Sequence, residues 1–471
     1  MIKDHLQTIL IENLGHNPTS GQNKLMLELA GFILSDSIDE IFLIKGYAGT
    51  GKTTVVSSIV KTLKSLILKS VLLAPTGRAA KVLSSYSGHS AYTIHKKIYR
   101  QKSSSDGFGK FVLDKNLHNS TYFIVDEASM ISNVTSEFSE FGSGHLLDDL
   151  ISYVYNGKNC KLILLGDTAQ LPPVGLTIGC ALNAGQLEVY GKKVYEVYLK
   201  EVVRHSANSG ILINATGIRN NIANKNIQIP KIKQNNYTDI QRLNGSELPD
   251  ELSSAFDKYG IDNCMLICRS NKQTNQYNKG IRNRILWREN EICAGDRLMV
   301  VKNNYFWMKD VPEMDFIANG DIAEILRINK YEEIYNYRFA DVTLKFIDYK
   351  DLEIDAKINL SNLFINSASM SYEDSKAFYQ SVAEDYYEIK SKRKRFEKIR
   401  ENPFFNSLQV KFAYAVTCHK AQGGQWKVVF VDQGYLPDNF PDIDYLRWFY
   451  TAVTRATEKL YLVNFKDEFF E

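Results

Sequence analysis

A glycine-rich run near the N-terminus has the composition of a phosphate-binding loop. Residues 46–53 read Gly-Tyr-Ala-Gly-Thr-Gly-Lys-Thr, which matches the pattern G-x-x-x-x-G-K-[ST], and an apolar run that predicts a strand precedes them at residues 41–45. Glycines let the backbone wrap closely around a phosphate, and the helix expected from Thr53 onward adds its unpaired N–H groups. Lys52 would neutralise the β- and γ-phosphates, and the Thr53 hydroxyl would bind Mg²⁺. This context favours a nucleotide site over a chance glycine-rich turn.

Two adjacent carboxylates follow another apolar run, residues 122–125. They are Asp126 and Glu127. One of them would hold the metal ion and the other would polarise the attacking water. A helix N-cap can look the same, but the position of this pair downstream of a phosphate-binding loop favours catalysis. The loop and the pair together predict hydrolysis of a nucleoside triphosphate.

A third apolar run, residues 162–165, leads into the sequence Gly-Asp-Thr-Ala-Gln-Leu-Pro-Pro-Val at residues 166–174. The side-chain amide of Gln170 would then lie at the C-terminal end of a strand, where an amide can sense a γ-phosphate. The paired prolines predict a stiff connection toward the next domain.

The elements that position these groups read as a doubly wound α/β domain. Short apolar runs alternate with helical patterns, which is typical of a parallel sheet buried on both faces. The predicted strands are residues 41–45, 71–74, 122–125 and 162–165, and the predicted helices are residues 53–68 and 79–85.

A second set of similar strands indicates a second α/β domain with an insertion. These strands are residues 264–268, 410–416, 428–431 and 460–463. The first is separated from the others by about 140 residues of different character. Within that gap, residues 294–348 show strand-like patches with turn signals, which fits a small barrel. Residues 372–401 predict a long helical stretch that is acidic early and basic late, either a solvated helix face or a nucleic-acid surface.

Composition excludes several classes of protein. The chain has 471 residues, and 57 Lys plus Arg against 54 Asp plus Glu give a net charge of +3, too small to indicate a partner. No apolar run approaches the roughly 18 to 20 residues of a membrane span. The N-terminus lacks the pattern of a signal peptide. The six cysteines contain no C-x-x-C pair, so we expect reduced structural cysteines in a cytoplasmic protein.

Taken together, five motifs resemble those of superfamily 1 helicases. They occur in the order found in that family, and the resemblance spans residues 22–456. The closer resemblance is to superfamily 1B, the 5′-to-3′ branch that includes RecD and the phage Dda helicase. The motifs are LAPTGRAAK at 73–81, DEAS at 126–129, GDTAQLPPV at 166–174, TCHKAQG at 417–423 and YTAVTRA at 450–456.

The resemblance implies a fold and a domain organisation. It implies two RecA-like parallel-sheet domains, a β-hairpin insert called the pin, and an inserted SH3-like barrel with a helical arm. We expect the first RecA-like domain at residues 1–185 with the pin at 97–119, the second at 186–271 and 408–471, and the inserted domain at 272–407.

The resemblance also implies roles in the ATP site. Gln22 would read the adenine edge, Gln170 would sense the γ-phosphate, and the second domain would present two arginines to the phosphates. The alternative for Gln22 is an exposed glutamine at the start of a helix, and the alternative for Arg204 and Arg455 is a surface salt bridge. The implied nucleotide-binding residues are Gln22, Gly49, Thr50, Gly51, Lys52, Thr53, Thr54, Asp126, Gln170, Arg204, Gly423 and Arg455. The catalytic set is Lys52, Glu127, Gln170, Arg204 and Arg455, and the Mg²⁺ ligands are Thr53 and Asp126.

The family's DNA contacts map to a third group of residues. Hydroxyls, a glycine amide and single cations suit phosphate oxygens, so we expect contact with the backbone and not with sequence. Phe108, flanked by glycines in the pin, would be the strand-separating wedge, with a mobile loop as the alternative. For His95, the alternative to a DNA contact is a neutral side chain that packs within the protein. The implied contacts are Thr76, Gly77, Arg78, Thr93, His95, Phe108, Thr417, His419 and Lys420.

The predicted function is therefore an ATP- and Mg²⁺-dependent DNA helicase. We expect it to move 5′ to 3′ on single-stranded DNA and to act at single-strand/duplex junctions. We also expect it to work as a monomer and to have no membrane partner. Candidate partners are single-strand-binding or replisome proteins. Candidate pathways are replication, repair and recombination. An ATP-gated nucleic-acid clamp and an RNA helicase remain alternatives. Polarity rests wholly on the resemblance, and Gln425 departs from the carboxylate that many relatives carry nearby.

Overall fold

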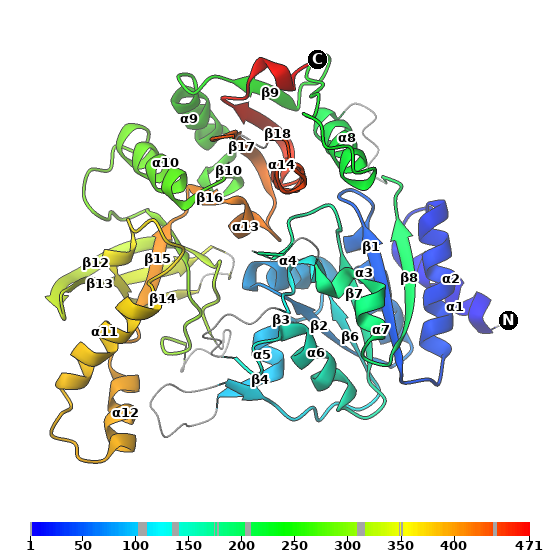
Figure 1. Ribbon diagram of the computed structural model, residues 1–471, viewed down its shortest axis with the longest axis horizontal. Coiled ribbons are helices and arrows are strands. Elements are labelled where there is room, and N and C mark those ends of the chain that lie inside the picture. The colour runs from blue at the N-terminus through cyan, green and yellow to red at the C-terminus, as the bar shows by residue number, and fades with distance from the viewer. Residues whose placement is uncertain are drawn as a thin grey trace. The chain divides into compact units, whose positions relative to one another are not determined.

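The computed structural model describes residues 2–101, 111–133, 141–173, 175–176, 179–202, 209–308, 316–347, 349, 352–436 and 440–471. The chain forms two compact units (Figure 1). The first contains the described residues up to Pro230 together with Pro441–Thr454, and the second contains the described residues of Lys231–Phe440 and Arg455–Glu471. Among the described helices, none is long and apolar enough to cross a membrane.

The first unit is built on a six-stranded parallel sheet in the order β3-β2-β6-β7-β1-β8. Successive side chains of a strand point to opposite faces. Phe42 and Ile44 of β1 accordingly join one core, and Ile41 and Leu43 join the other. The strands are β1 (Glu40–Gly46), β2 (Lys69–Ala74), β3 (Ala91–Thr93), β6 (Thr121–Val125), β7 (Lys161–Gly166) and β8 (Lys193–Leu199). The predicted α/β domain is confirmed.

Helices cover both faces of this sheet, as in a doubly wound fold. The core on one face includes residues of α1 (Ile2–Leu14), α2 (Ser20–Leu34), α3 (Lys52–Ser65) and α4 (Gly77–Ser87). The core on the other face includes residues of α5 (Ile94–Ile98), α6 (Leu146–Tyr155) and α7 (Ala184–Glu188). Two further helices of this unit, α8 (Gly210–Ala223) and α14 (Ile443–Val453), pack against each other.

The predicted boundary at residue 185 does not match the end of the first sheet. Strand β8 lies beyond it and pairs in parallel with β1. β8 lies at the edge of the sheet, and its residues are less buried than those of the neighbouring β1. Residues 441–454, predicted in the second domain, belong to the first unit.

The second unit combines a parallel sheet with a closed barrel. The sheet has the order β16-β10-β17-β18-β9, and the barrel consists of β11 to β15. The sheet strands are β9 (Ile240–Leu243), β10 (Cys264–Cys268), β16 (Ala415–Thr417), β17 (Trp426–Asp432) and β18 (Ala456–Val463). The barrel strands are β11 (Arg297–Val300), β12 (Ile322–Ile334), β13 (Tyr337–Phe346), β14 (Glu353–Asn359) and β15 (Leu408–Phe412). The helices of this sheet are α9 (Leu248–Tyr259), α10 (Asn271–Arg284) and α13 (Cys418–Ala421).

The strand predicted at residues 410–416 is in fact two strands in different sheets. β15 pairs antiparallel with β11 of the barrel, whereas β16 pairs in parallel with β10. Both are buried and apolar, so the sequence pattern does not mark the break between them. The inserted domain therefore ends after β15, past the predicted boundary at residue 407.

The predicted helical stretch of residues 372–401 is a hairpin of two helices, α11 (Tyr372–Glu384) and α12 (Lys392–Glu401). It lies against the barrel through a separate aromatic core that includes Phe339, Phe378 and Ile399. The short antiparallel pair β4 (Tyr99–Gln101) and β5 (Phe111–Leu113) lies in the first unit. The 3-10 helices are η1 (Ala128–Met130), η2 (Cys180–Leu182), η3 (Ile261–Asn263), η4 (Leu360–Asn362) and η5 (Asp467–Phe469).

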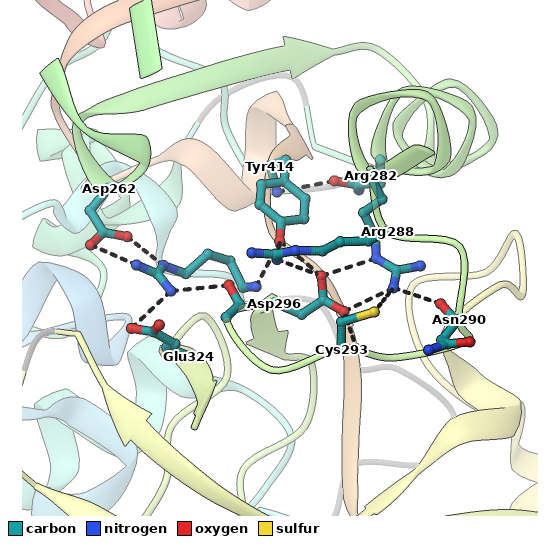
Figure 2. A network of polar contacts seen from close by, with 11 residues as sticks. Asp262, Arg282, Arg288, Asn290, Cys293, Asp296, Glu324 and Tyr414 are labelled. Atoms are coloured by element: carbon teal, nitrogen blue, oxygen red, sulfur yellow. Dashed lines mark hydrogen bonds and ion pairs between the residues drawn. The ribbon is translucent and has the colours of Figure 1, made fainter. Parts of the chain in front are cut away.

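A buried ionic network joins the second sheet to the barrel (Figure 2). Asp296, fully buried before β11, accepts from Arg282 of α10 at 3.0 and 2.9 Å and from Arg288 at 2.8 Å. The Tyr414 hydroxyl and the Cys293 amide complete its shell at 3.0 and 2.7 Å. One apolar core also spans sheet and barrel. These shared contacts bind the sheet and the barrel into one unit.

Candidate nucleotide and nucleic-acid sites

The phosphate-binding loop follows the buried end of β1 and leads into α3. Gly49 and Gly51 have φ values of +78° and +84°, in the left-handed region that favours glycine. A Cβ at Gly46 would lie 2.9 Å from the Thr50 hydroxyl and 3.0 Å from Cγ of Lys52. These three positions therefore require glycine for the loop to keep its shape.

Lys52 lies at the first position of α3 and points back over the loop. Its ammonium donates to the carbonyls of Gly46 and Tyr47 at 2.7 and 2.9 Å. It also lies 3.8 Å from a carboxylate oxygen of Asp167, which is fully buried at the end of β7. A cation held at the carboxyl edge of the sheet is suited to neutralise phosphate charge.

Tyr450 of α14 ties this loop to Asp167. Its hydroxyl donates to Asp167 at 2.8 Å and accepts from the Ala48 amide at 2.8 Å. Burial and the Asp167 charge raise the pKa of Tyr450 well above its usual range, so the hydroxyl remains a donor. The same Asp167 also accepts from the Ala169 amide at 2.9 Å. The Tyr450 hydroxyl thus holds the phosphate-binding loop in place.

The predicted metal ligands converge on a tyrosine. The Tyr86 hydroxyl donates to Asp126 at 2.6 Å, and burial with this carboxylate raises the Tyr86 pKa, which a hydrogen bond to Thr53 partly offsets. The oxygens of Thr53 and Asp126 therefore face the same point, and hard oxygen donors of this kind fit Mg²⁺. Within the described residues, no three His, Cys, Asp or Glu side chains gather as a metal site.

Glu127 occupies a strained position next to this cluster. Its φ is +53°, in the left-handed region, and its amide donates to Asp126 at 2.8 Å. A non-glycine residue held in this region costs about 1–3 kcal/mol, and such strain is concentrated at functional sites. This placement supports the catalytic role predicted for Glu127.

Both predicted glutamines are buried near the loop. Gln22 accepts from the Thr19 amide at 3.1 Å and donates to the Thr50 carbonyl at 3.2 Å. The alternative of an exposed helix-start glutamine is wrong, because Gln22 is fully buried. Gln170 is 4% exposed, and its side-chain oxygen makes no hydrogen bond within the described structure. The adenine and γ-phosphate roles stay predictions.

Two of the predicted DNA contacts cap helices at neighbouring strands of the first sheet. Thr76 follows β2 and accepts from the Ala79 amide of α4 at 3.2 Å, and Thr93 is the last residue of β3 and accepts from the Lys96 amide of α5 at 3.2 Å. Gly77 and Arg78 form the first turn of α4. Parallel strands end at one edge, so these groups share the carboxyl edge of the sheet.

His95 packs within this unit. Its ring lies 5.7 Å from Tyr99 and 5.0 Å from Phe141, and burial lowers its pKa to about 4. The imidazole is therefore neutral near pH 7. These contacts support the packing alternative, and the DNA contact stays a prediction.

The second unit carries its own candidate phosphate contacts at the end of β16. Thr417 precedes α13, and its hydroxyl makes no capping bond. Burial lowers the pKa of Lys420 to about 8 and also lowers that of His419. The Lys420 ammonium donates to the side-chain oxygen of Asn319 at 2.5 Å. His419 and Lys420 therefore both bind a proton less readily than they would in water.

Arg455 lies beside the glycine turn that contains Gly423. It is 3% exposed, and its guanidinium donates to the Gly424 carbonyl at 3.1 Å. Gly423 has a φ of +75°, which glycine accommodates without strain. The alternative of a surface salt bridge is wrong for Arg455, because the side chain is buried.

Comparison with known proteins gives the family. A model for an AAA domain matches residues 20–231, and a model for a UvrD-like helicase C-terminal domain matches residues 412–463. The ATP-dependent DNA helicase Dda of Enterobacteria phage T4 is 25% identical, and the alignment covers 89% of this chain and 93% of Dda. These matches support a superfamily 1B helicase of the Dda and RecD type.

One further relative and one solved structure are similar to this chain. The ATP-dependent RecD2 DNA helicase of Deinococcus radiodurans is 29% identical over 43% of this helicase and 25% of RecD2. The crystal structure of Pif1 helicase from Bacteroides, in complex with ADP-AlF3 and ssDNA, has a TM-score of 0.51 and 15% identity over 97% of this chain and 95% of Pif1. That likeness supports the fold.

Two predicted site residues of this helicase, Arg204 and Phe108, lie outside the described residues. Most of the other residues predicted for the ATP site in the first unit lie at the carboxyl ends of β1, β6 and β7, and Gln22 lies in α2. The segment predicted as the pin, residues 97–119, contains the antiparallel pair β4 and β5.

Sequence reasoning missed four residues that the structure places at the nucleotide site of the helicase. Three of them are Asp167, Tyr86 and Tyr450. The fourth, Arg219 of α8, is 9% exposed, lies 4.5 Å from the Tyr47 ring and donates to the Lys200 carbonyl at 3.2 Å. Only Asp167 had a sequence signal, as the acidic residue directly after a buried strand. The tyrosines and Arg219 come from distant helices and carry no local pattern.

Proposed function

We propose that this helicase hydrolyses ATP to move 5′ to 3′ along single-stranded DNA and to separate duplex at junctions without reading sequence. One observation carries the motor part of this proposal. Lys52, Thr53, Asp126 and Asp167 converge at the carboxyl edge of one sheet, which is the arrangement that phosphoryl transfer requires. The DNA part is supported by Thr76 and Thr93 at the same edge, and by the relatives named as DNA helicases.

The residues of the chain divide the work of hydrolysis. Lys52 neutralises phosphate charge, Glu127 polarises the attacking water, and Gln170 senses the γ-phosphate. Thr53 and Asp126 would hold Mg²⁺, which when bound offsets charge on the phosphate oxygens. Arg204 and Arg455 supply guanidinium groups, which stay charged and grip phosphate oxygens in a bidentate manner.

The nucleic-acid contacts are proposed to act on the backbone. Hydroxyls at Thr76, Thr93 and Thr417, together with Lys420, suit phosphate oxygens of any sequence. Affinity should therefore depend strongly on salt and little on sequence. The order of association and release during the ATP cycle then produces stepping along the strand.

Lys52→Ala tests the motor assignment. Removing the ammonium leaves the phosphate charge without its partner, so ATP hydrolysis stimulated by single-stranded DNA should fall by at least 100-fold. Steady-state ATPase assays with DNA or RNA oligonucleotides as activators measure this and distinguish a DNA motor from an RNA motor. Near-normal turnover in the variant would contradict the assigned site, and stronger stimulation by RNA would contradict the assigned track.

A further inference from the structure

The C-terminal part of the helical arm holds an unusual share of the positive charge of the chain, whereas residues 372–387, which contain α11, are acidic. Residues 388–401 contain seven Lys and Arg and three Glu, so their net charge is 7 − 3 = +4, more than the +3 of the whole chain. The rest of the chain therefore sums to −1. A nearly neutral protein thus carries its excess positive charge on one short segment, which contains α12.

The aromatic core beneath α12 fixes the direction in which this charge points. Phe396 and Ile399 are buried, at 7% and 0% exposure, and Ile399 shares that core with Phe378 of α11. Tyr335, at the tip of the β12–β13 hairpin, lies 6.0 Å from Phe378 and 5.9 Å from Phe404. Because the inner face of α12 is packed, the cations occupy its outer face at fixed positions.

Neighbouring groups of the arm neutralise only part of this charge. Arg393 pairs with Glu397 at 3.1 Å and Lys398 with Glu401 at 2.9 Å, but all four side chains are more than half exposed. Exposed pairs of this kind are worth little and exchange readily with another anion. Lys390, Lys392 and Lys394 are exposed and make no ion pair within the described part of the chain.

Arg395 has a different task from these lysines. Its guanidinium donates to the carbonyls of Tyr387 at 3.1 Å and Ile389 at 3.0 Å, which closes the connection between α11 and α12. The guanidinium keeps its charge while it makes these bonds. It therefore adds to the positive potential of the face that it also holds in place.

The shape of this surface selects duplex over single-stranded nucleic acid. α12 has ten residues, so its cations spread over about 15 Å of a convex helix. A duplex of that length carries about nine phosphate charges, at one per roughly 1.7 Å. Single strands are bound in grooves where bases stack on aromatic side chains. In the arm, Tyr387 is 78% and Tyr372 51% exposed, whereas the aromatic residues of the arm core are buried or partly buried.

We propose that the outer face of α12 binds the phosphate backbone of duplex DNA, so that the helical arm holds the duplex that the motor separates. This inference rests on the proposed function, because the helicase brings duplex to the arm. It adds a second nucleic-acid surface, separate in sequence from Thr417 and Lys420.

A triple substitution of the lysines without ion pairs tests the surface. The variant Lys390→Gln, Lys392→Gln, Lys394→Gln removes three charges from the arm. The control Lys24→Gln, Lys61→Gln, Lys64→Gln removes three charges from exposed lysines of α2 and α3. Fluorescence anisotropy measures the affinity of each for a blunt duplex and for a single-stranded oligonucleotide over a KCl series. Circular-dichroism melting verifies that both variants are folded.

We expect the arm variant to bind duplex at least tenfold more weakly at low salt. The slope of log K against log[KCl] should fall by up to about 2.7, since each lost phosphate contact contributes about 0.9. Single-strand affinity and ATPase stimulated by single strands should match the control. A duplex affinity and slope equal to those of the control would overturn the proposal, as would an equal loss for both nucleic acids. Failure of the proposed function is distinguishable, because it would appear as absent DNA-stimulated ATPase in the unaltered protein.

Discussion

The hydroxyl of Tyr450 shows how a single atom can organise the nucleotide site. It joins the loop amide of Ala48 to the buried Asp167, which also faces Lys52. The phosphate-binding loop, the end of β7 and α14 thus meet at the Tyr450 hydroxyl. A helix that is far away in the sequence takes part in positioning the phosphates.

Tyr450→Phe should therefore weaken ATP binding more than it slows turnover. The change leaves the Ala48 amide and the Asp167 carboxylate without this partner, and an unsatisfied buried group costs about 1–3 kcal/mol. We expect KM for ATP to rise about tenfold or more, with a smaller change in kcat. Steady-state kinetics measures the two constants.

Tyr155→Phe is the matched control for this substitution. The Tyr155 hydroxyl donates to the Glu40 carbonyl at 2.6 Å, at the opposite end of β1. Its loss should lower Tm without changing KM. An unchanged KM in Tyr450→Phe would show that the loop keeps its shape without the phenol.

If Lys420 contacts DNA as proposed, the affinity for DNA should depend on pH. Burial lowers its pKa to about 8, so the ammonium is charged at pH 7 and loses its proton as the pH rises through 8. An ordinary lysine would remain charged throughout this range. Affinity for single-stranded DNA should thus fall between pH 7 and pH 9.

The variant Lys420→Arg isolates this titration, because a guanidinium stays charged over the same range. Anisotropy titrations at constant ionic strength compare the two proteins. The fall in affinity should be several-fold in the unaltered helicase and much smaller in the variant. Parallel curves for both proteins would assign the pH dependence to another group.

At the scale of elements, the buried Asp296 network holds α10, β11 and the turn before β16 together (Figure 2). Asp296→Asn should destabilise the second unit by about 3–5 kcal/mol, because it leaves the guanidinium groups of Arg282 and Arg288 buried without their partner charge. Urea denaturation monitored by tryptophan fluorescence measures the change.

Asp262→Asn provides the comparison for the network. Asp262 pairs with Arg297 at 2.6 Å, but its side chain is 40% exposed. Its replacement should cost about 1 kcal/mol or less. Equal losses in the two variants would argue against a special role for the buried network.

The elements also show what the sequence could predict. The strands that carry Asp126 and Gln170 were visible because continuous apolar runs mark strands buried on both faces. The division between β15 and β16 was not visible, since ten nearly continuous buried residues belong to two different sheets. The break between α11 and α12 was also missed, because residues 385–391 contain no Gly or Pro and periodicity alone does not show where a helix ends.

Residues that meet only in three dimensions account for most of what remained unpredicted. Glu127 and Lys52 lie in motifs with a mechanism and were found from spacing. Tyr86 and Arg219 act through contacts with Asp126 and Tyr47, and nothing in their own segments marks those contacts. Burial and partner choice are properties of the packed chain, so such residues become visible only in the structure.

At the scale of the whole molecule, small net charge and a helicase function are compatible. The chain carries +3 in total, yet residues 388–401 alone carry +4. The phosphate contacts proposed elsewhere in the chain are hydroxyls, amides and single cations placed at strand ends. Such a distribution allows a motor to release its track in each cycle, because each contact is weak and sensitive to salt.

The central claim is an ATP-driven motor with 5′-to-3′ polarity. Its most direct test is strand displacement on two duplexes of the same sequence, one with a 5′ single-stranded tail and one with a 3′ tail, with Lys52→Ala as the inactive control. We predict ATP-dependent unwinding of the 5′-tailed duplex only. Unwinding of the 3′-tailed duplex alone would contradict the polarity, and ATP hydrolysis without unwinding of either duplex would contradict the motor.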